Sequence, residues 1–201
     1  MDANIRIATF EDVEGIVRIH QVSFEKFFLT SLGERFLRLY YSSFIKSGEG
    51  VVYCAESDNK IIGFSACSYV SNGFNARLIK KNLIKYGIET LRLLVNNPKA
   101  VIRLVRNLNK ESKEDGINDK GQYAELYSIA IDPQCQGSGI GKLLLTITEA
   151  NVKNHNTKIS LTTDYYNNEK TIGFYHSLGY KEYYEFTTYP ERRMWRMIKE
   201  L

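Results

Sequence analysis

Residues 124–150, AELYSIAIDPQCQGSGIGKLLLTITEA, predict a strand, a glycine-rich turn and a helix in that order. An apolar, β-prone run ends at Ile131, and Asp132-Pro133 stops it because proline donates no ladder hydrogen bond. Three glycines follow at alternate positions: Gly137, Gly139 and Gly141. Apolar residues then recur at the spacing of one buried helix face: Ile140, Leu143, Leu144 and Ile147. Backbone N–H groups at the start of a helix bind phosphate, so this stretch predicts a phosphate-bearing ligand on the turn.

The composition around this stretch is that of an ordinary globular protein. The chain has 201 residues, of which 43% are hydrophobic and 25% charged, and its net charge of +4 gives no argument for nucleic acid. Its three cysteines, Cys54, Cys67 and Cys135, lack metal-ligand spacing and fit a reducing compartment, so we expect a cytoplasmic protein without a metal. No apolar run approaches about 18 residues and the N-terminus has no signal-like apolar region, so we expect no transmembrane span and no signal peptide.

Upstream of the stretch, the pattern predicts a strand, two helices and a hairpin. The strand is Ile5 to Ala8, and Thr9 with Asp12 resembles the cap of a first helix, on which His20 is interpreted as a packing residue. A second capping box, Ser31-x-x-Glu34, predicts the start of a second helix that turns four aromatic and aliphatic side chains inward: Phe36, Leu37, Tyr40 and Phe44. Two β-rich runs joined by Ser57-Asp58-Asn59 predict an antiparallel hairpin: Val51–Ala55 and Lys60–Tyr69. The aromatic connector between the helices has two interpretations, core packing or the wall of a substrate pocket: Phe24, Phe27 and Phe28.

A basic helical segment interrupts this order. Residues 75–95 and 99–108 have helical patterns, and Asn96-Asn97-Pro98 separates them. Gly87 weakens the first helical pattern, and residues 111–121 are predicted to be a polar loop. Nine basic residues stand against one acid between Asn75 and Lys110. The segment therefore predicts either a solvated face of an inserted hairpin, or a surface for anionic membranes or phosphorylated ligands.

The remainder of the chain predicts further strands and one helix. Lys158–Thr163 is a strand, a helix runs from Asn167-Asn168 to about Leu178, and two closing strands follow: Tyr180–Thr188 and Arg192–Lys199. The whole chain, 1–201, is thus predicted to be a single α/β domain with a mixed sheet and a helical insert at about 75–121.

Spacing between the glycines discriminates between phosphate-binding loops. A P-loop would need glycine at position 136 and Ser or Thr at 143, and a G-x-G-x-x-G dinucleotide turn would need glycine at 142 or 144; none is present. The pattern that fits is Q-x-x-G-x-G, with Gln136, Gly139 and Gly141. It resembles the acetyl-coenzyme A pyrophosphate loop of the GNAT acetyltransferase superfamily.

A second motif strengthens the resemblance. Asn168-x-x-Thr171-x-x-Phe174-Tyr175-x-x-x-Gly179-Tyr180 is similar to the family's N-x-x-A-x-x-F-Y-x-x-x-G-F helix, with Thr171 in place of alanine and Tyr180 in place of phenylalanine. The resemblance covers the chain apart from roughly 75–121. It implies a GNAT-like acyl-CoA N-acyltransferase fold with an inserted basic helical segment.

The resemblance also implies which residues bind acetyl-CoA. The pantetheine arm would lie along the strand backbone at Ile129, Ala130 and Ile131. The pyrophosphate would bind the N–H groups of the loop: Gln136, Gly137, Ser138, Gly139, Ile140 and Gly141. Lys142 either adds charge or is a helix-surface lysine, and Asn168 would orient the helix start or the cofactor arm.

Transfer of an acetyl group to an amine implies an acid and a base. An alkyl amine has a pKa of about 10 and needs to lose a proton before attack. Glu125 resembles the position of a catalytic glutamate in several family members, with a strand-end surface acid as the alternative. Tyr175 matches the family's usual general acid, with a core aromatic as the alternative.

The acceptor is less defined by the sequence. We expect an amine-bearing small molecule, and the hypothesis is that the cationic face of the insert receives an anionic or phosphorylated acceptor. Two other functions stay open, a catalytically silent coenzyme A-binding module and a membrane-peripheral protein whose basic helices are the functional part. Amine against hydroxyl, acyl chain length, and monomer against homodimer are left open.

Overall fold

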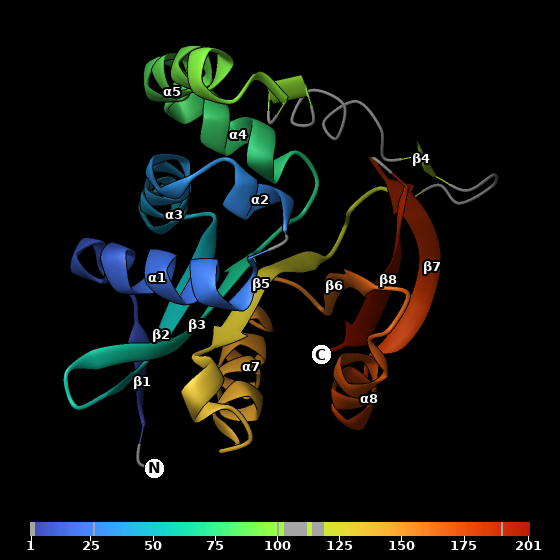
Figure 1. Ribbon diagram of the computed structural model, residues 1–201. Coiled ribbons are helices and arrows are strands. Elements are labelled where there is room, and N and C mark those ends of the chain that lie inside the picture. Colours follow the sequence, from blue (N-terminus) through green and yellow to red (C-terminus); the bar gives the residue numbers. More distant parts are fainter. Residues whose placement is uncertain (1–2, 26, 100, 103–111, 114–118, 190) are drawn as a thin grey trace.

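A mixed eight-stranded sheet forms the frame of the computed structural model, which describes residues 3–25, 27–99, 101–102, 112–113, 119–189 and 191–201 (Figure 1). The strand order is β1-β2-β3-β5-β6-β8-β7-β4, and every neighbouring pair is antiparallel except the parallel pair β5–β6. The strands are β1 (Asn4–Ile7), β2 (Gly50–Ser57), β3 (Lys60–Ser68), β4 (Ser112–Lys113), β5 (Ala124–Ile131), β6 (Lys158–Asp164), β7 (Lys181–Thr188) and β8 (Arg192–Glu200). The helices are α1 (Val13–Ser23), α2 (Phe28–Ser31), α3 (Glu34–Ser47), α4 (Phe74–Lys81), α5 (Leu83–Asn96), α7 (Ile140–Val152) and α8 (Glu169–Ser177). The predicted mixed α/β class is confirmed.

Local chemistry explains how several of these elements begin and end. The β2–β3 hairpin closes on Asp58 and Asn59, whose φ angles of 50° and 58° suit the tight two-residue turn that Asp and Asn tolerate. The cap before α1 is also as predicted, since the Asp12 carboxylate accepts the Thr9 N–H at 2.7 Å. The second capping box is wrong. Ser31 ends α2, and α3 begins at Glu34 after Gly33, whose φ of 86° favours glycine.

Helices cover both faces of the β1–β5 half of the sheet. Val52 and Cys54 of β2 pack in the core that α1 and α3 form, whereas Val51 and Ala55 point to the opposite face, where Ala55 packs with α7. This alternation follows from the two-residue period of a strand. On α7 the buried row is Ile140, Leu144, Leu145, Thr148 and Val152. Leu143, predicted to be on that face, is 46% exposed, because the helix is turned toward Leu145 instead.

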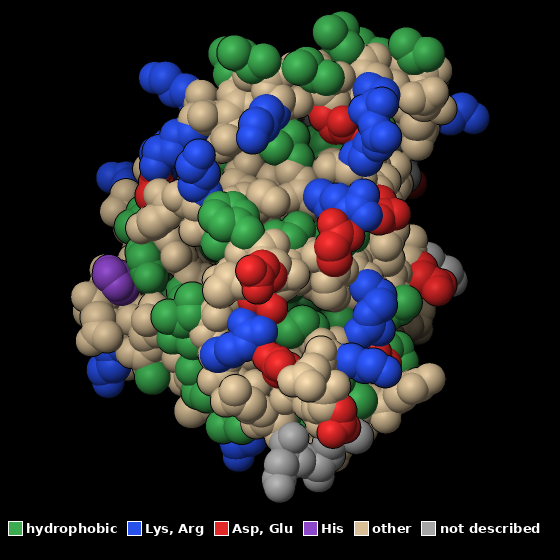
Figure 2. Space-filling view, turned by 90° about the vertical axis from the view of Figure 1, so that its left-hand side faces the viewer, with side chains coloured by type: hydrophobic (Ala, Val, Ile, Leu, Met, Phe, Trp, Pro, Cys, Tyr) green, Lys and Arg blue, Asp and Glu red, His purple; other side chains and the backbone are tan. Residues whose placement is uncertain are grey.

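The described part of the insert includes α4 and α5, which pack at one end of the molecule, and residues 98–99 and 101–102 are also helical (Figure 1). The chain breaks at Asn82, with φ of −129°, and Gly87 lies inside α5. The Asn82 side chain donates to the Leu78 carbonyl at 3.2 Å and its own carbonyl accepts the Tyr86 N–H, so this residue links α4 to α5. Hydrophobic, lysine and arginine side chains gather on the surface at this end (Figure 2). Residues 103–111 and 114–118, which include most of the predicted second helix and polar loop, lie outside the described residues.

Among the residues that the structure describes, no helix is both long and apolar enough to cross a bilayer.

Candidate active site

The parallel strands β5 and β6 pair over only part of their length. Register pairs join Ala124–Leu126 to Ile159–Leu161, and beyond Leu126 the only described strand that pairs with β5 is β3, on its other edge. The backbone of 127–131 therefore has an edge toward β6 that is not used by the sheet. The predicted pantetheine residues Ile129, Ala130 and Ile131 lie on this stretch and line a cavity of about 1090 Å³.

The glycine turn leads from the end of β5 into α7. Asp132 accepts the Gln134 N–H, which holds a short 3-10 turn at 133–135, and the Gln136 side chain donates back to the Ile131 carbonyl at 3.3 Å. Gly137 and Gly139 have φ of 79° and 84°, and a Cβ at either would meet open space. The N–H groups of the first α7 turn have no intrahelical acceptor, because the first such bond runs from Leu143 to Gly139. All the predicted loop residues from 136 to 142 line the cavity, and Lys142 is exposed.

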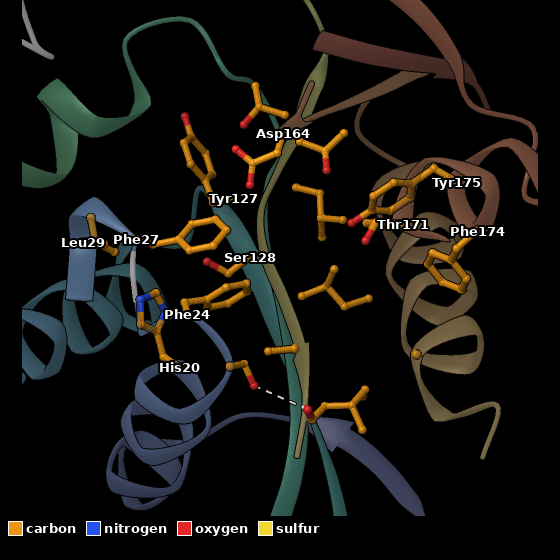
Figure 3. A pocket seen from close by; sticks show the side chains of 18 of the residues that line it. His20, Phe24, Phe27, Leu29, Tyr127, Ser128, Asp164, Thr171, Phe174 and Tyr175 are labelled. Carbon is orange, nitrogen blue, oxygen red and sulfur yellow. Dashed lines mark hydrogen bonds between the residues drawn. The ribbon is translucent and has the colours of Figure 1, made fainter. Parts of the chain in front are cut away.

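Helix α8 forms the opposite wall and carries the second motif. Asn168 precedes it and donates to the Thr163 hydroxyl at 2.6 Å and to the Asp164 carbonyl at 3.1 Å, so it anchors the helix start on β6. Tyr175 lies on the cavity-facing side and points toward β5 (Figure 3). None of the described residues hydrogen-bonds its hydroxyl, and burial raises the pKa of Tyr175, which stays protonated at neutral pH.

Glu125 lies on β5 as predicted but not in the cavity wall. Its carboxylate accepts Arg196 Nη1 of β8 at 2.5 Å, and the Ser71 hydroxyl also donates to it. The side chain is turned to Arg196 and is 8% exposed, so it is not the strand-end surface acid of the alternative, and a role for Glu125 as catalytic base stays a prediction. Glu125 connects to the cavity through Tyr127, a lining residue whose pKa is raised by burial and by the adjacent Glu125 charge.

The other side of β5 is an aromatic wall. Phe24 and Phe27 of the connector between α1 and α2 reach toward β5, and Leu29 lies behind them on α2 (Figure 3); Phe27 is 36% exposed. Both interpretations of this connector apply, because Phe24 and Phe28 also pack against the core while all three phenylalanines line the cavity. Residues from α3, α4 and α5 extend the wall: Phe36, Tyr40, Leu78, Ile79 and Tyr86. Their apolar character was visible in the sequence, but their convergence on one cavity was not.

His20 is a cavity-lining residue that the sequence interpretation treated as half-buried packing. It is 3% exposed, and burial lowers its pKa to about 4. His20 Nδ1 lies 2.7 Å from the Tyr41 hydroxyl oxygen, which is also 3.2 Å from the Ser128 hydroxyl. His20 Nε2 has no hydrogen-bond partner among the described residues.

A contact across the cavity joins the two walls. Arg192, at the start of β8, is held by Asp164 through bonds of 2.5 and 2.7 Å and lies 4.2 Å above the Phe27 ring. All three residues line the cavity. The arginine thus connects the β6–β8 half of the sheet with the aromatic connector.

Three lysines on α4 and α5 do not line this cavity. Lys80, Lys81 and Lys85 are exposed and absent from its lining, and Lys81 pairs with Glu49 at 2.5 Å. The hypothesis that they receive an anionic acceptor therefore has no support in their position.

The sequence matches one protein-family model, and the fold is similar to solved structures. The model of the acetyltransferase (GNAT) family matches residues 13–180. The ribosomal-protein-S18-alanine N-acetyltransferase of Escherichia coli is similar with a TM-score of 0.62 and 14% identity, over 99% of this chain and 94% of that chain. The PaiA N-acetyltransferase of Thermoplasma acidophilum, solved in complex with coenzyme A, has a TM-score of 0.61 and 17% identity over 100% of both chains. Among curated protein sequences, none matches. At these identities the structural likeness concerns the fold alone.

Proposed function

The chain belongs to the GNAT acetyltransferase family, and on this basis we propose that it transfers an acetyl group from acetyl-CoA to the amine of an acceptor with an apolar body. One observation carries the proposal: the free N–H groups of the glycine turn, the unused edge of β5 and the Tyr175 side chain all belong to one cavity. The turn would bind the pyrophosphate. The pantetheine amides would hydrogen-bond the β5 edge as an added strand does.

The residues support a direct transfer. The acceptor loses one proton to become a neutral amine, its nitrogen attacks the thioester carbonyl, and the C–N bond forms as the C–S bond breaks. The Tyr175 hydroxyl donates a hydrogen bond to the departing thiolate sulfur. Of the two protons that the nitrogen releases, one completes the coenzyme A thiol and the other passes to solvent. A buried phenol suits this role because it stays protonated and can donate at neutral pH.

We assign Glu125 a positioning role in place of direct contact with the acceptor. Its carboxylate lies beside the Tyr127 phenol, which lines the cavity, and Arg196 holds it in place. In this arrangement the Tyr127 hydroxyl donates to Glu125, so its oxygen is left to accept an N–H of the acceptor amine.

The aromatic wall supports an apolar acceptor. The acceptor side of the cavity is formed largely by Phe24, Phe27, Phe28, Leu29, Phe36, Leu78 and Ile79. An amine that buries its body there gains about 0.8 kcal/mol per methylene, or about fourfold in affinity. Anionic groups would gain no such contact, and Arg192, a cation that lines the cavity, is already paired with Asp164.

The test is a thiol-release assay with acetyl-CoA and primary amines that differ in the apolar body: short alkyl, long alkyl, phenylethyl and indolyl amines, with phosphorylated amino sugars as the contrasting set. We expect kcat/KM to rise with the buried body by about fourfold per methylene. Equal or better turnover of the phosphorylated set would contradict the acceptor class. Coenzyme A binding without thiol release from any amine would indicate the silent binding module.

Tyr175→Phe tests the acid role in the same assay. We expect kcat to fall about 100-fold or more with little change in the affinity for acetyl-CoA. The matched control is Tyr180→Phe, because its ring lies 5.6 Å from that of Tyr175, whereas its hydroxyl bonds Glu149 outside the cavity. Loss of stability without loss of kcat is expected there. Wild-type kcat in Tyr175→Phe would remove this residue from the mechanism.

A further inference from the structure

Helix α5 is apolar on two opposite faces, and among the described residues only one of these faces has packing partners. Tyr86 and Leu93 are buried, and the Tyr86 ring contacts Phe36 of α3 at 5.7 Å. The other face exposes six large apolar side chains by 48% to 83%: Leu83, Ile84, Ile88, Leu91, Leu94 and Val95. At about 100° per residue they fall within an arc of roughly 140°, which is one continuous stripe. Exposed apolar stripes of this size mark interaction surfaces.

Basic side chains border the stripe. Lys85 and Arg92 follow it on the helix wheel, and Lys80 of α4 and Lys99 lie near the two ends of α5 in the chain. From residue 74 to residue 99 there are six Lys or Arg and one acid, Glu89. Hydrophobic side chains with blue lysine and arginine among them are visible at this end of the molecule (Figure 2). The surface combines an apolar stripe with a positive border.

We propose that this face of α5 binds the surface of an anionic membrane. A helix that lies in a bilayer interface buries its apolar stripe among the acyl chains and places Lys and Arg at the level of the headgroups. Anionic headgroups complement the border of Lys85 and Arg92. Two copies of this chain that paired through the same face would bring their basic borders together, and like-charge repulsion opposes that arrangement.

The exposed apolar stripe of α5 lies on the same helix pair that lines the acceptor side of the cavity. Tyr86 of α5, and Leu78 and Ile79 of α4, line the cavity from the inner side of the same helices. An apolar amine that partitions into the interface would thus be concentrated beside its site. This consequence rests on the proposed function, whereas membrane binding itself does not.

Vesicle co-sedimentation with the full chain tests the proposal. The probes are vesicles of phosphatidylcholine alone and of phosphatidylcholine with phosphatidylserine in equal parts. We expect the wild type to sediment with the anionic vesicles, and less so as salt rises. Ile84→Ser/Ile88→Ser/Val95→Ser should stay in the supernatant, and Lys80→Glu/Lys85→Glu should lose roughly tenfold or more in affinity for the anionic vesicles. None of these five residues lines the cavity.

The matched control makes the same kinds of change away from α5. Ile7, Lys60 and Lys181 are exposed on other elements, and Ile7→Ser/Lys60→Glu/Lys181→Glu should bind vesicles like the wild type. A wild type that stays in the supernatant with anionic vesicles overturns the proposal, as does a serine variant that still sediments. Sedimentation velocity tests whether a second copy of the chain occupies this face instead. If the wild type is a dimer that does not bind vesicles, and the serine variant is a monomer, the proposal is also overturned. Thiol release with a water-soluble amine, measured on the same preparations, tests the proposed function separately.

Discussion

The backbone of Gly141 allows a side chain, whereas the backbones of Gly137 and Gly139 do not favour one. Gly137 and Gly139 have left-handed backbones, whereas a Cβ on Gly141 would make ordinary contacts of 3.7 Å with Ile131 and 4.0 Å with Phe174. A methyl group therefore fits the folded chain at 141. It would, however, stand between two residues of the cavity wall, where the pyrophosphate is proposed to approach the N–H groups.

We predict that Gly141→Ala keeps or raises stability but weakens coenzyme A binding. Alanine in a helix is favoured over glycine by about 0.5–1 kcal/mol. The methyl group should raise the Kd for coenzyme A about tenfold or more, a cost of about 1.4 kcal/mol. Thermal unfolding and titration calorimetry measure the two quantities. Gly139→Ala is the control, because its φ of 84° should make it lose about 1–2 kcal/mol of stability. Wild-type affinity in Gly141→Ala would contradict a pyrophosphate at this turn.

Among the elements, β5 and β8 are tied together where the sheet opens. Arg196 of β8 reaches Glu125 of β5, and both are buried, with Arg196 4% exposed and Glu125 8%. Glu125 is one of the three residues at the start of β5 that pair with β6. The ion pair therefore holds the sheet together just before the strands separate.

We predict that breaking this pair from one side destabilises the fold more than removing both charges. Arg196→Met leaves a buried carboxylate without its cation, at a cost of about 3–5 kcal/mol. Glu125→Leu/Arg196→Met should recover part of that loss. Chemical denaturation of the wild type, the double variant and the two single variants, Glu125→Leu and Arg196→Met, measures the difference as a coupling energy. Additive losses would mean that the two side chains contribute independently.

The elements themselves could largely be predicted from sequence, because their signals are local. The β5–turn–α7 unit, the β2–β3 hairpin and the start of α8 at Asn168 each carry turn or cap residues within a few positions of the boundary. Errors occurred where two local signals competed. Ser31-x-x-Glu34 has the letters of a capping box, yet Gly33 provides the left-handed residue before α3. The break at Asn82 was not predicted, because Gly87 is the residue of this stretch with the weakest helix propensity.

At the scale of the whole molecule, the cavity combines segments that no local pattern connects. His20 of α1, the end of β5, Tyr175 of α8 and Arg192 of β8 are separated by most of the chain and meet on its lining. The glycine turn and Tyr175 were found through motifs, which record positions on single elements. The orientation of Glu125 toward Arg196 depends on a register between strands 71 residues apart, which the sequence alone does not reveal.

Acid stability is a property of the whole molecule that His20 should control in one pH window. Its folded pKa is about 4 against 6.5 for the free group, because burial disfavours the charged form. Between these values the unfolded chain binds the proton and the folded chain does not, so stability falls as pH drops from 6.5 to 4. The loss is about 3 kcal/mol, and this group adds no further slope below pH 4.

We predict that His20→Gln flattens the pH dependence of stability in that window. Glutamine keeps an amide near Tyr41 and does not titrate. The matched control is Asp12→Asn: hydrogen bonds from Arg6 lower the pKa of Asp12 to about 2 from 3.8, so the stability that Asp12 provides is present above 3.8 and is lost below it. Asp12→Asn should therefore lower stability at neutral pH and leave the slope between 6.5 and 4 as in the wild type. Urea denaturation across this range measures both variants.

An unchanged slope in His20→Gln would contradict this prediction, because it would mean that His20 takes up its proton in the folded protein. The Phe24 ring, which lies 4.9 Å from the imidazole, would then have to move aside and open the cavity to water.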